Sequence, residues 1–161
     1  MSKDKTPVTP AIRLLREKQV AFTSHLYPYE EKGGTAVSAR ELGVSEHAVI
    51  KTLIMEDDGK HPLIVLMHGD LQVSTRELAR CIGVRSVNPC APAVADKHSG
   101  YQVGGTSPFA TRKMMPVYLE ESILELPKIY INGGKRGFLV GIDPQEVMRL
   151  LQPALVKVGI K

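Results

Sequence analysis

A glycine-rich connection with two cations at its tip is the first segment of this chain whose residues could do chemistry. It reads Ile131-Asn132-Gly133-Gly134-Lys135-Arg136-Gly137-Phe138 and joins two short apolar runs, which predicts a β-hairpin. Glycine reaches positive φ without steric cost, and this connection holds more glycine than a hairpin turn requires. The backbone freedom beside Lys135 and Arg136 indicates a close approach to an anionic or carbonyl-bearing ligand. A solvated turn fits the same pattern equally well.

Lys51 is the second candidate, because it interrupts an apolar predicted strand that runs from Val49 to Met55. Strand alternation places Lys51 on one face with Val49, Leu53 and Met55. An ammonium there must reach the sheet edge along its aliphatic stem, pair with a carboxylate or point into a polar cleft. The functional interpretation is a partly desolvated ammonium that holds a phosphate or polarises an ester carbonyl.

A second glycine pair lies in the segment Val103-Gly104-Gly105-Thr106-Ser107-Pro108-Phe109. Backbone N–H groups in such a turn can bind a developing oxyanion or a carboxylate. A bulge or tight turn accounts for the pattern as well. The basic pairs Arg112-Lys113 and Lys135-Arg136 could form a rim around a site, although paired charges also occur on a solvated face.

Several other chemistries are not indicated by the sequence. It has neither the Gly-x-Gly-x-x-Gly of dinucleotide sites nor the spacing of a phosphate-binding P-loop. Its five histidines include no His-x-x-x-His pair, so neither a metal nor another cofactor is expected. Cys81 falls on the apolar face of a predicted helix, where a core role is expected. Cys90 lies between prolines and would be a nucleophile only if a base approached it in the fold.

Size and composition are those of one soluble globular domain. The chain has 161 residues, 43% of them apolar, and 21 basic against 17 acidic side chains give a net charge of +4. This mildly basic balance permits an RNA or phosphate partner without requiring one. No apolar run is long enough to span a membrane, and Met1 to Pro10 lacks the apolar segment of a secretory signal. Two cysteines do not make a disulfide framework, so a cytoplasmic location is expected.

The candidate residues must be positioned by elements that the sequence also predicts. Thr9 and Pro10 are typical of an N-cap and a first helical residue, and capping boxes begin at Ser74 and Asp143. Helices are expected over 10–19, 35–42, 74–83, 92–98 and 143–151, and strands over 22–27, 49–55, 62–68, 101–103, 117–119, 129–131 and 138–140. This mixture of hairpins and helices predicts a single α/β (α+β) domain over residues 1–161.

Three ordered motifs and the opening of the chain resemble one known family. The motifs are Val49-Ile50-Lys51-Thr52-Leu53, then Ser99-Gly100-Tyr101-Gln102-Val103-Gly104-Gly105-Thr106-Ser107-Pro108, and then Gly133-Gly134-Lys135-Arg136-Gly137. With Thr9-Pro10-Ala11-Ile12 and the His25-x-Tyr27 pair, they make nearly the whole chain similar to the YbaK/EbsC family. Members of that family are free-standing relatives of the editing domain of bacterial prolyl-tRNA synthetases.

The resemblance implies deacylation of mischarged tRNA, typically Cys-tRNA(Pro), by a mixed α/β domain with a curved sheet flanked by helices. Lys51 matches the family's essential lysine, Tyr27 a pocket tyrosine, and Gly104 a glycine whose backbone helps to hold the aminoacyl ester. The mechanism proposed for the family uses no metal and no protein nucleophile. The pocket aligns the ester, and the substrate's own thiol attacks its carbonyl.

The expected site follows from these motifs. It comprises catalytic Lys51, the substrate-binding residues Tyr27, Gly104, Gly105, Thr106, Asn132, Gly133 and Gly134, and the tRNA-binding residues Arg112, Lys113, Lys135 and Arg136. The expected partner is the 3′ end of a mischarged tRNA, with prolyl-tRNA synthetase as a candidate third component.

The chain departs from the family pattern at three places, which bear on pocket volume and substrate choice. Asn132 stands where cysteine-editing members usually carry Ser, Lys32-Gly33-Gly34 replaces a Phe-Gly pair, and Ala110 replaces a glycine. An amide donates and accepts together, where serine offers a rotatable hydroxyl. Two alternatives stay open: a non-catalytic module that binds tRNA or an aminoacyl-like ligand, and deacylation of another small group such as alanyl or seryl.

Overall fold

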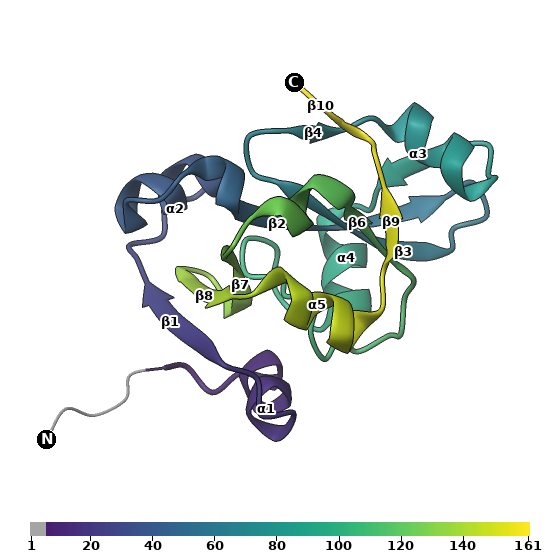
Figure 1. Cartoon of the computed structure of the whole chain (residues 1–161). Helices are drawn as coiled ribbons and strands as arrows, with labels where there is room; N and C mark the ends of the chain where they lie inside the picture. The colour runs from purple at the N-terminus through teal and green to yellow at the C-terminus, as the bar shows by residue number, and fades with distance from the viewer. Residues whose placement is uncertain (1–5) are drawn as a thin grey trace, which may run out of the picture.

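A mixed eight-stranded sheet forms the centre of the molecule, which a computed structural model describes over residues 6–161. The strand order is β1-β8-β7-β2-β3-β6-β9, with β5 paired to β2, and β4 and β10 form a separate pair (Figure 1). The strands are β1 (Phe22–Leu26), β2 (Val49–Asp57), β3 (Pro62–His68), β4 (Gln72–Val73), β5 (Val87–Pro89), β6 (Val117–Glu120), β7 (Ile129–Lys135), β8 (Phe138–Ile142), β9 (Ala154–Val156) and β10 (Gly159–Ile160).

In the described part of the chain the helices are α1 (Pro10–Glu17), α2 (Gly34–Leu42), α3 (Thr75–Ile82), α4 (Pro92–Ser99), α5 (Pro144–Leu151) and two short 3₁₀ turns, Glu46–Ala48 and Glu121–Glu125. Helices α1, α3 and α5 begin at residues whose side chains cap them, whereas α2 and α4 follow Gly33 and Ala91, which make no such bond. Thr9, Ser74 and Asp143 each accept a hydrogen bond from a backbone N–H in the first turn, as the sequence predicts. Left-handed glycines at 43 and 83 end α2 and α3.

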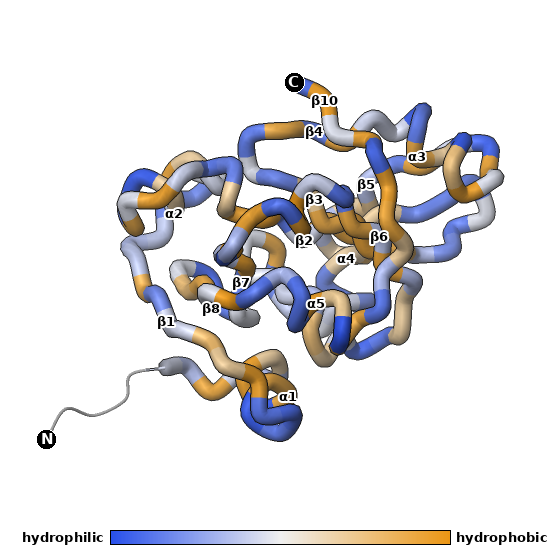
Figure 2. Tube along the Cα trace, viewed as in Figure 1, coloured by the Kyte–Doolittle hydropathy of each residue, from blue (hydrophilic) through white to orange (hydrophobic). Residues whose placement is uncertain are grey.

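Helices cover both faces of the sheet, which explains why its central strands are apolar on both sides. The main core contains side chains of α1, α4 and α5 packed against Ile50 and Ile64. On the opposite face, α3 packs on a second cluster with Met55 and Val65, and α2 packs on a third with Val49. Figure 2 shows hydrophobic residues gathered in the central strands β3 and β6, with hydrophilic residues in the outer loops.

Strand β2 is left uncovered along part of one edge. Its pairing with β3 extends over residues 50–56. On the other side it pairs with β7 only at 49–50 and with β5 only at 55–57. The Ile54 carbonyl also accepts from the Cys90 N–H at 3.1 Å, so residues 51–53 border a gap between these neighbours, and this free edge of β2 positions the site described below.

The structure confirms the α/β (α+β) class, the single domain, the mixed sheet and the flanking helices. The expected strand over 101–103 is wrong, because side chains hold this segment as a turn. The Asp96 carboxylate accepts from the Val103 N–H at 2.9 Å, and the Ser99 hydroxyl accepts from the Tyr101 N–H at 3.1 Å. Cys81 is exposed and not in the core, since α3 turns other residues inward.

The short strands β4, β5, β9 and β10 were not expected, because two or three residues carry no periodic signal. Among the described residues, no helix combines the length and apolar character that crossing a membrane requires.

Candidate functional site

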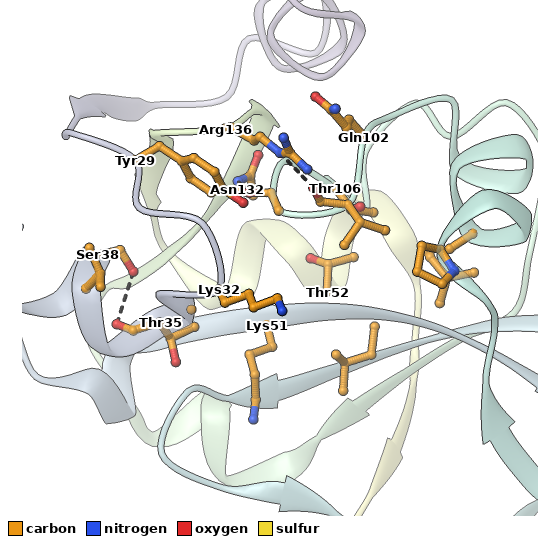
Figure 3. Close-up of a pocket in the computed structure, with 18 of the residues that line it drawn as sticks. Tyr29, Lys32, Thr35, Ser38, Lys51, Thr52, Gln102, Thr106, Asn132 and Arg136 are labelled. Atoms are coloured by element: carbon orange, nitrogen blue, oxygen red, sulfur yellow. Dashed lines mark hydrogen bonds between the residues drawn. The ribbon is translucent and has the colours of Figure 1, made fainter.

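A cavity of about 740 Å³ opens at the free edge of β2 (Figure 3). Its wall comes from the loop 27–35, from β2, from segments 89–96 and 102–106, and from the β7–β8 hairpin. The volume lies in the range of small-molecule sites, so the cavity has room for more than one amino acid side chain.

Neighbouring residues of β2 point to opposite sides of this free edge. Thr52 shares a face with Ile50 and Ile54 of the main core, whereas Lys51 lies on the other face (Figure 3). Both line the cavity, which therefore extends around the edge of the sheet. Thr52 Oγ1 is shielded from solvent and, within residues 6–161, has no hydrogen-bond partner. Such a hydroxyl is costly when unpaired, and a rotation about the Cα–Cβ bond of Thr52 would turn it toward the cavity that this residue lines, where a polar ligand can satisfy it.

Lys51 is partly buried, and its ammonium donates a hydrogen bond to the carbonyl oxygen of Leu71. Burial lowers the pKa of Lys51, while the nearby carboxylates of Glu46 and Asp70 favour the charged form and oppose this shift. Figure 3 shows the ammonium directed away from Asn132. Contact with an ester on that side of β2 therefore requires the flexible lysine side chain to rotate.

Asn132 joins the two glycine turns at the mouth of the cavity. Its Nδ2 donates to the Gly104 carbonyl oxygen at 3.2 Å. Its Oδ1 accepts from the N–H groups of Gly134 and Lys135 at 2.7 and 3.1 Å. The amide thereby fixes the position of Gly104 relative to β7.

Gly104 must be glycine for a local reason. Its φ is +93°, and a Cβ there would lie 2.7 Å from the hydroxyl oxygen of Tyr29. The same turn places Thr106 on the cavity wall. The structure thus brings Lys51, Tyr27, Gly104, Thr106 and Asn132 of the expected site to one cavity, together with Arg136.

Three glycines expected to bind substrate, Gly105, Gly133 and Gly134, lie behind this wall. A Cβ on Gly105 would lie 2.6 Å from the backbone nitrogen of Arg136, so the two turns touch through their main chains. The Gly133 carbonyl accepts from the hydroxyl of Thr9 at 2.5 Å, and the same hydroxyl caps α1. These contacts support the wall and connect it to the first helix.

Aromatic and cationic side chains surround the entrance. Burial raises the pKa of Tyr27, which lies on the wall beside α2. The Arg136 guanidinium lies over the Tyr29 ring, 5.1 Å from its centroid, and its Nε donates to the Val103 carbonyl at 2.9 Å. Lys32 is directed into the cavity (Figure 3).

The remaining cations expected to contact tRNA, Arg112, Lys113 and Lys135, are exposed and lie outside the cavity wall. The backbone N–H groups of Arg112 and Lys113 donate to the carbonyls of Ser99 and His98 at 3.0 and 2.9 Å. These two cations therefore lie beside the C-terminal end of α4.

Within the described chain, His47, His68 and Asp70 place ligand-type atoms within 4.8 Å of one another. The imidazoles are stacked with centroids 3.6 Å apart. One nitrogen of His68 bonds the His47 carbonyl at 2.7 Å, and the other bonds the Ser122 hydroxyl at 2.7 Å. His47 Nδ1 contacts Asp70 at 2.9 Å. Because both His68 nitrogens are engaged, this group is a hydrogen-bonded network that supports the turn leading to Leu71.

The expected site did not include several of the cavity residues, among them Thr52, Tyr29 and Lys32. Strand alternation could have placed Thr52, since it follows Lys51 and must point to the opposite face. Tyr29 and Lys32 belong to a polar loop without periodicity; the family resemblance connects this loop with pocket volume, and the fold shows which of its side chains line the cavity.

Comparison with known proteins gives a consistent result. Residues 30–150 match the family model described as an aminoacyl-tRNA editing domain. The chain is 26% identical, over all of its own length and 99% of the relative's, to an Enterococcus faecalis protein described as "Putative Cys-tRNA(Pro)/Cys-tRNA(Cys) deacylase EbsC".

Solved structures share the fold. One, described as a hypothetical protein, has a TM-score of 0.86 at 22% identity and covers 94% of this chain and 100% of that chain. Another, described as "a putative trans-editing enzyme for prolyl tRNA synthetase", has a TM-score of 0.82 at 18% identity. The match covers 97% of this chain and 100% of that chain. The family match spans most of the residues that build the cavity. The chain therefore belongs to the aminoacyl-tRNA editing domain family, a family of aminoacyl-tRNA deacylases, and its resemblance to YbaK/EbsC proteins is confirmed.

Proposed function

We propose that this protein is a cytoplasmic trans-editing enzyme that removes cysteine from Cys-tRNA(Pro) in the cavity at the free edge of β2, with residues 1–161 acting as one editing domain. The observation that carries the proposal is that Lys51, Gly104 and Thr52, whose hydroxyl has no partner among the described residues, line one cavity. The Enterococcus faecalis relative, whose description names cysteinyl-tRNA, supports the choice of amino acid.

The inner wall suits a cysteine side chain. Ile54, Cys90 and Ala95 line it and are buried, so this part of the cavity is apolar. A thiol behaves as a small hydrophobic group with a weak donor, which matches such a surface. The unpaired Thr52 hydroxyl can then contact a polar atom of the aminoacyl group at the free edge.

In the proposed reaction the pocket holds the aminoacyl ester so that its own thiol attacks the ester carbonyl. A carbon–sulfur bond forms, the bond between the carbonyl carbon and the ribose oxygen breaks, and the proton lost by the thiol passes to that oxygen. The products are free tRNA and a cyclic thioester of cysteine. The protein supplies alignment, because both reacting groups belong to one substrate.

Lys51 supplies the electrostatic part of this mechanism. On substrate binding its ammonium leaves the Leu71 carbonyl and approaches the ester, where it stabilises the negative charge that develops on oxygen. The Gly104 turn, which Asn132 braces, holds the other side of the ester. The exposed cations Arg112, Lys113 and Lys135 contact the tRNA backbone and make binding dependent on salt.

The test is a deacylation panel with purified protein and tRNA(Pro) carrying cysteine, alanine, serine, proline or 2-aminobutyrate. The last has the shape of cysteine with a methyl group in place of the thiol. We expect rapid release from Cys-tRNA(Pro) only, and no release from the 2-aminobutyryl substrate. Equal cleavage of the cysteinyl and 2-aminobutyryl substrates would contradict attack by the thiol, and tight binding without any release would favour a non-catalytic module. Adding prolyl-tRNA synthetase shows whether a ternary complex improves selectivity.

A further inference from the structure

Tyr29 and Arg136 form a pair at the mouth of the cavity that the deacylation mechanism does not use. The guanidinium carbon of Arg136 lies 5.1 Å from the centroid of the Tyr29 ring. Both side chains line the cavity, and Tyr29 is 36% exposed, so part of its surface is open to a ligand.

The pair is held in place by contacts with the neighbouring turn. Arg136 Nε donates to the Val103 carbonyl oxygen at 2.9 Å, which restricts the plane of the guanidinium. A Cβ on Gly104 would lie 2.7 Å from Tyr29 Oη and 3.1 Å from Arg136 Nε. Glycine at this position therefore leaves the space that both side chains occupy, and the pair is ordered before any ligand arrives.

The composition of this surface matches a nucleobase. Val103, whose carbonyl binds Arg136, is 40% exposed, so the entrance presents an apolar side chain and an aromatic ring together with a planar cation. Bases of single-stranded RNA stack on aromatic rings and on guanidinium planes, and cations nearby attract the phosphates. Lys32 adds a further positive charge at the same entrance.

We propose that Tyr29 and Arg136 form a stacking platform for the base of the 3′-terminal nucleotide of tRNA. This inference rests on the proposed function, because the aminoacyl ester is attached to the ribose of that nucleotide. The ester and the base are attached to the same ribose. When the ester lies in the cavity, the base therefore lies close by, at the entrance. The platform thus recognises the RNA end independently of the amino acid.

The test uses two non-acylated RNA hairpins that end in the tRNA acceptor sequence. One has the terminal adenine, and the other has an abasic ribose at that position. We expect the wild-type protein to bind the hairpin with adenine at least about fivefold more tightly, the usual order for one stacked base. In Tyr29→Leu this preference disappears, whereas Tyr29→Phe retains it because the ring remains. Arg136→Lys keeps the charge and weakens the preference, because the planar surface is lost.

Lys113→Gln is the matched control, since Lys113 is an exposed cation outside the cavity. It should weaken binding of both hairpins equally and reduce the dependence on salt. The platform is overturned if wild-type protein binds both hairpins equally, or if Tyr29→Leu weakens both by the same factor. Deacylation of Cys-tRNA(Pro) is measured separately, so release of cysteine without a base preference would overturn the platform and leave the proposed function standing.

Discussion

The side-chain amide of Asn132 connects two turns that lie far apart in the sequence, since its nitrogen donates to the carbonyl oxygen of Gly104 at 3.2 Å. The carbonyl oxygen of the same amide accepts from the Gly134 N–H at 2.7 Å. A serine hydroxyl is too short and has too few polar atoms to make all of these contacts at once. The geometry of the entrance in this protein therefore depends on the asparagine.

Replacing Asn132 with alanine should loosen the Gly104 turn. We expect the free energy of unfolding to fall by about 1–2 kcal/mol, because backbone groups of both turns lose their partner. Deacylation should fall, with discrimination among cysteinyl, alanyl and seryl substrates reduced. Asn88→Ala, at an exposed position of β5, is the control. Unchanged specificity in Asn132→Ala, measured with the aminoacyl-tRNA panel, would show that the hydrogen bonds of the Asn132 amide have no role in substrate choice.

Thr52→Val should separate stability from activity. Its hydroxyl makes no hydrogen bond within the described chain, and valine has nearly the same shape, so the free energy of unfolding should stay within about 0.5 kcal/mol or rise. Deacylation should decrease, since Thr52 lines the cavity and valine cannot turn a hydroxyl toward the substrate. Thermal unfolding and single-turnover deacylation measure the two effects, and a variant with full activity would remove Thr52 from the site.

Gly105→Ala should destabilise the protein through the contact between the glycine turns. The added Cβ would lie 2.6 Å from the Arg136 backbone nitrogen, and backbone cannot move aside as a side chain can. We expect a loss of about 1–3 kcal/mol in unfolding free energy. Gly43→Asn is the control, because its φ is +67° with no atom within 4 Å of an added Cβ, and asparagine tolerates this conformation. Denaturant unfolding of both variants should show a clear loss for Gly105→Ala alone.

The charge of Lys51 should depend on Asp70. Burial lowers the pKa of Lys51 and Asp70 opposes this, so Asp70→Asn should lower the pKa further. The charged form is lost as pH rises through this pKa, so deacylation in Asp70→Asn should decline at a lower pH than in the wild type. The ¹³Cε resonance of Lys51, followed by NMR over a pH series, reports the pKa directly. Glu77→Gln on α3 should leave the pKa of Lys51 unchanged. The same pKa in Asp70→Asn as in the wild type would show that Asp70 does not influence the charge of Lys51.

The elements that carry the candidate residues could be predicted largely from local signals. Thr9, Ser74 and Asp143 predicted helix starts correctly, since a cap depends on its own residue and the next few. The hairpin around Gly133 followed from its apolar flanks and glycines. The apolar pattern around Lys51 correctly predicted the strand that carries it.

What the sequence could not provide depends on contacts between distant segments. The free edge of β2 exists because β7 and β5 end where they do, and no local pattern encodes those ends. The pairing of Arg136 with Tyr29, and the direction of the Lys51 ammonium toward Leu71, likewise arise from tertiary packing. The apolar residues at 101–103 predict a strand. Side-chain hydrogen bonds to the backbone hold the segment as a turn instead, and these bonds have no signature in the sequence pattern.

The electrostatic role of Lys51 is tested by measuring the release of cysteine from Cys-tRNA(Pro) by Lys51→Ala. The single hydrogen bond from the ammonium to Leu71 contributes little to the fold, so the thermal unfolding midpoint should change by only a few degrees. Lys60→Ala removes an exposed cation and should keep full activity. We predict that Lys51→Ala lowers the deacylation rate by about 100-fold or more while remaining folded. A folded Lys51→Ala protein that releases cysteine at the wild-type rate would contradict the stabilisation of the reacting ester by the Lys51 ammonium.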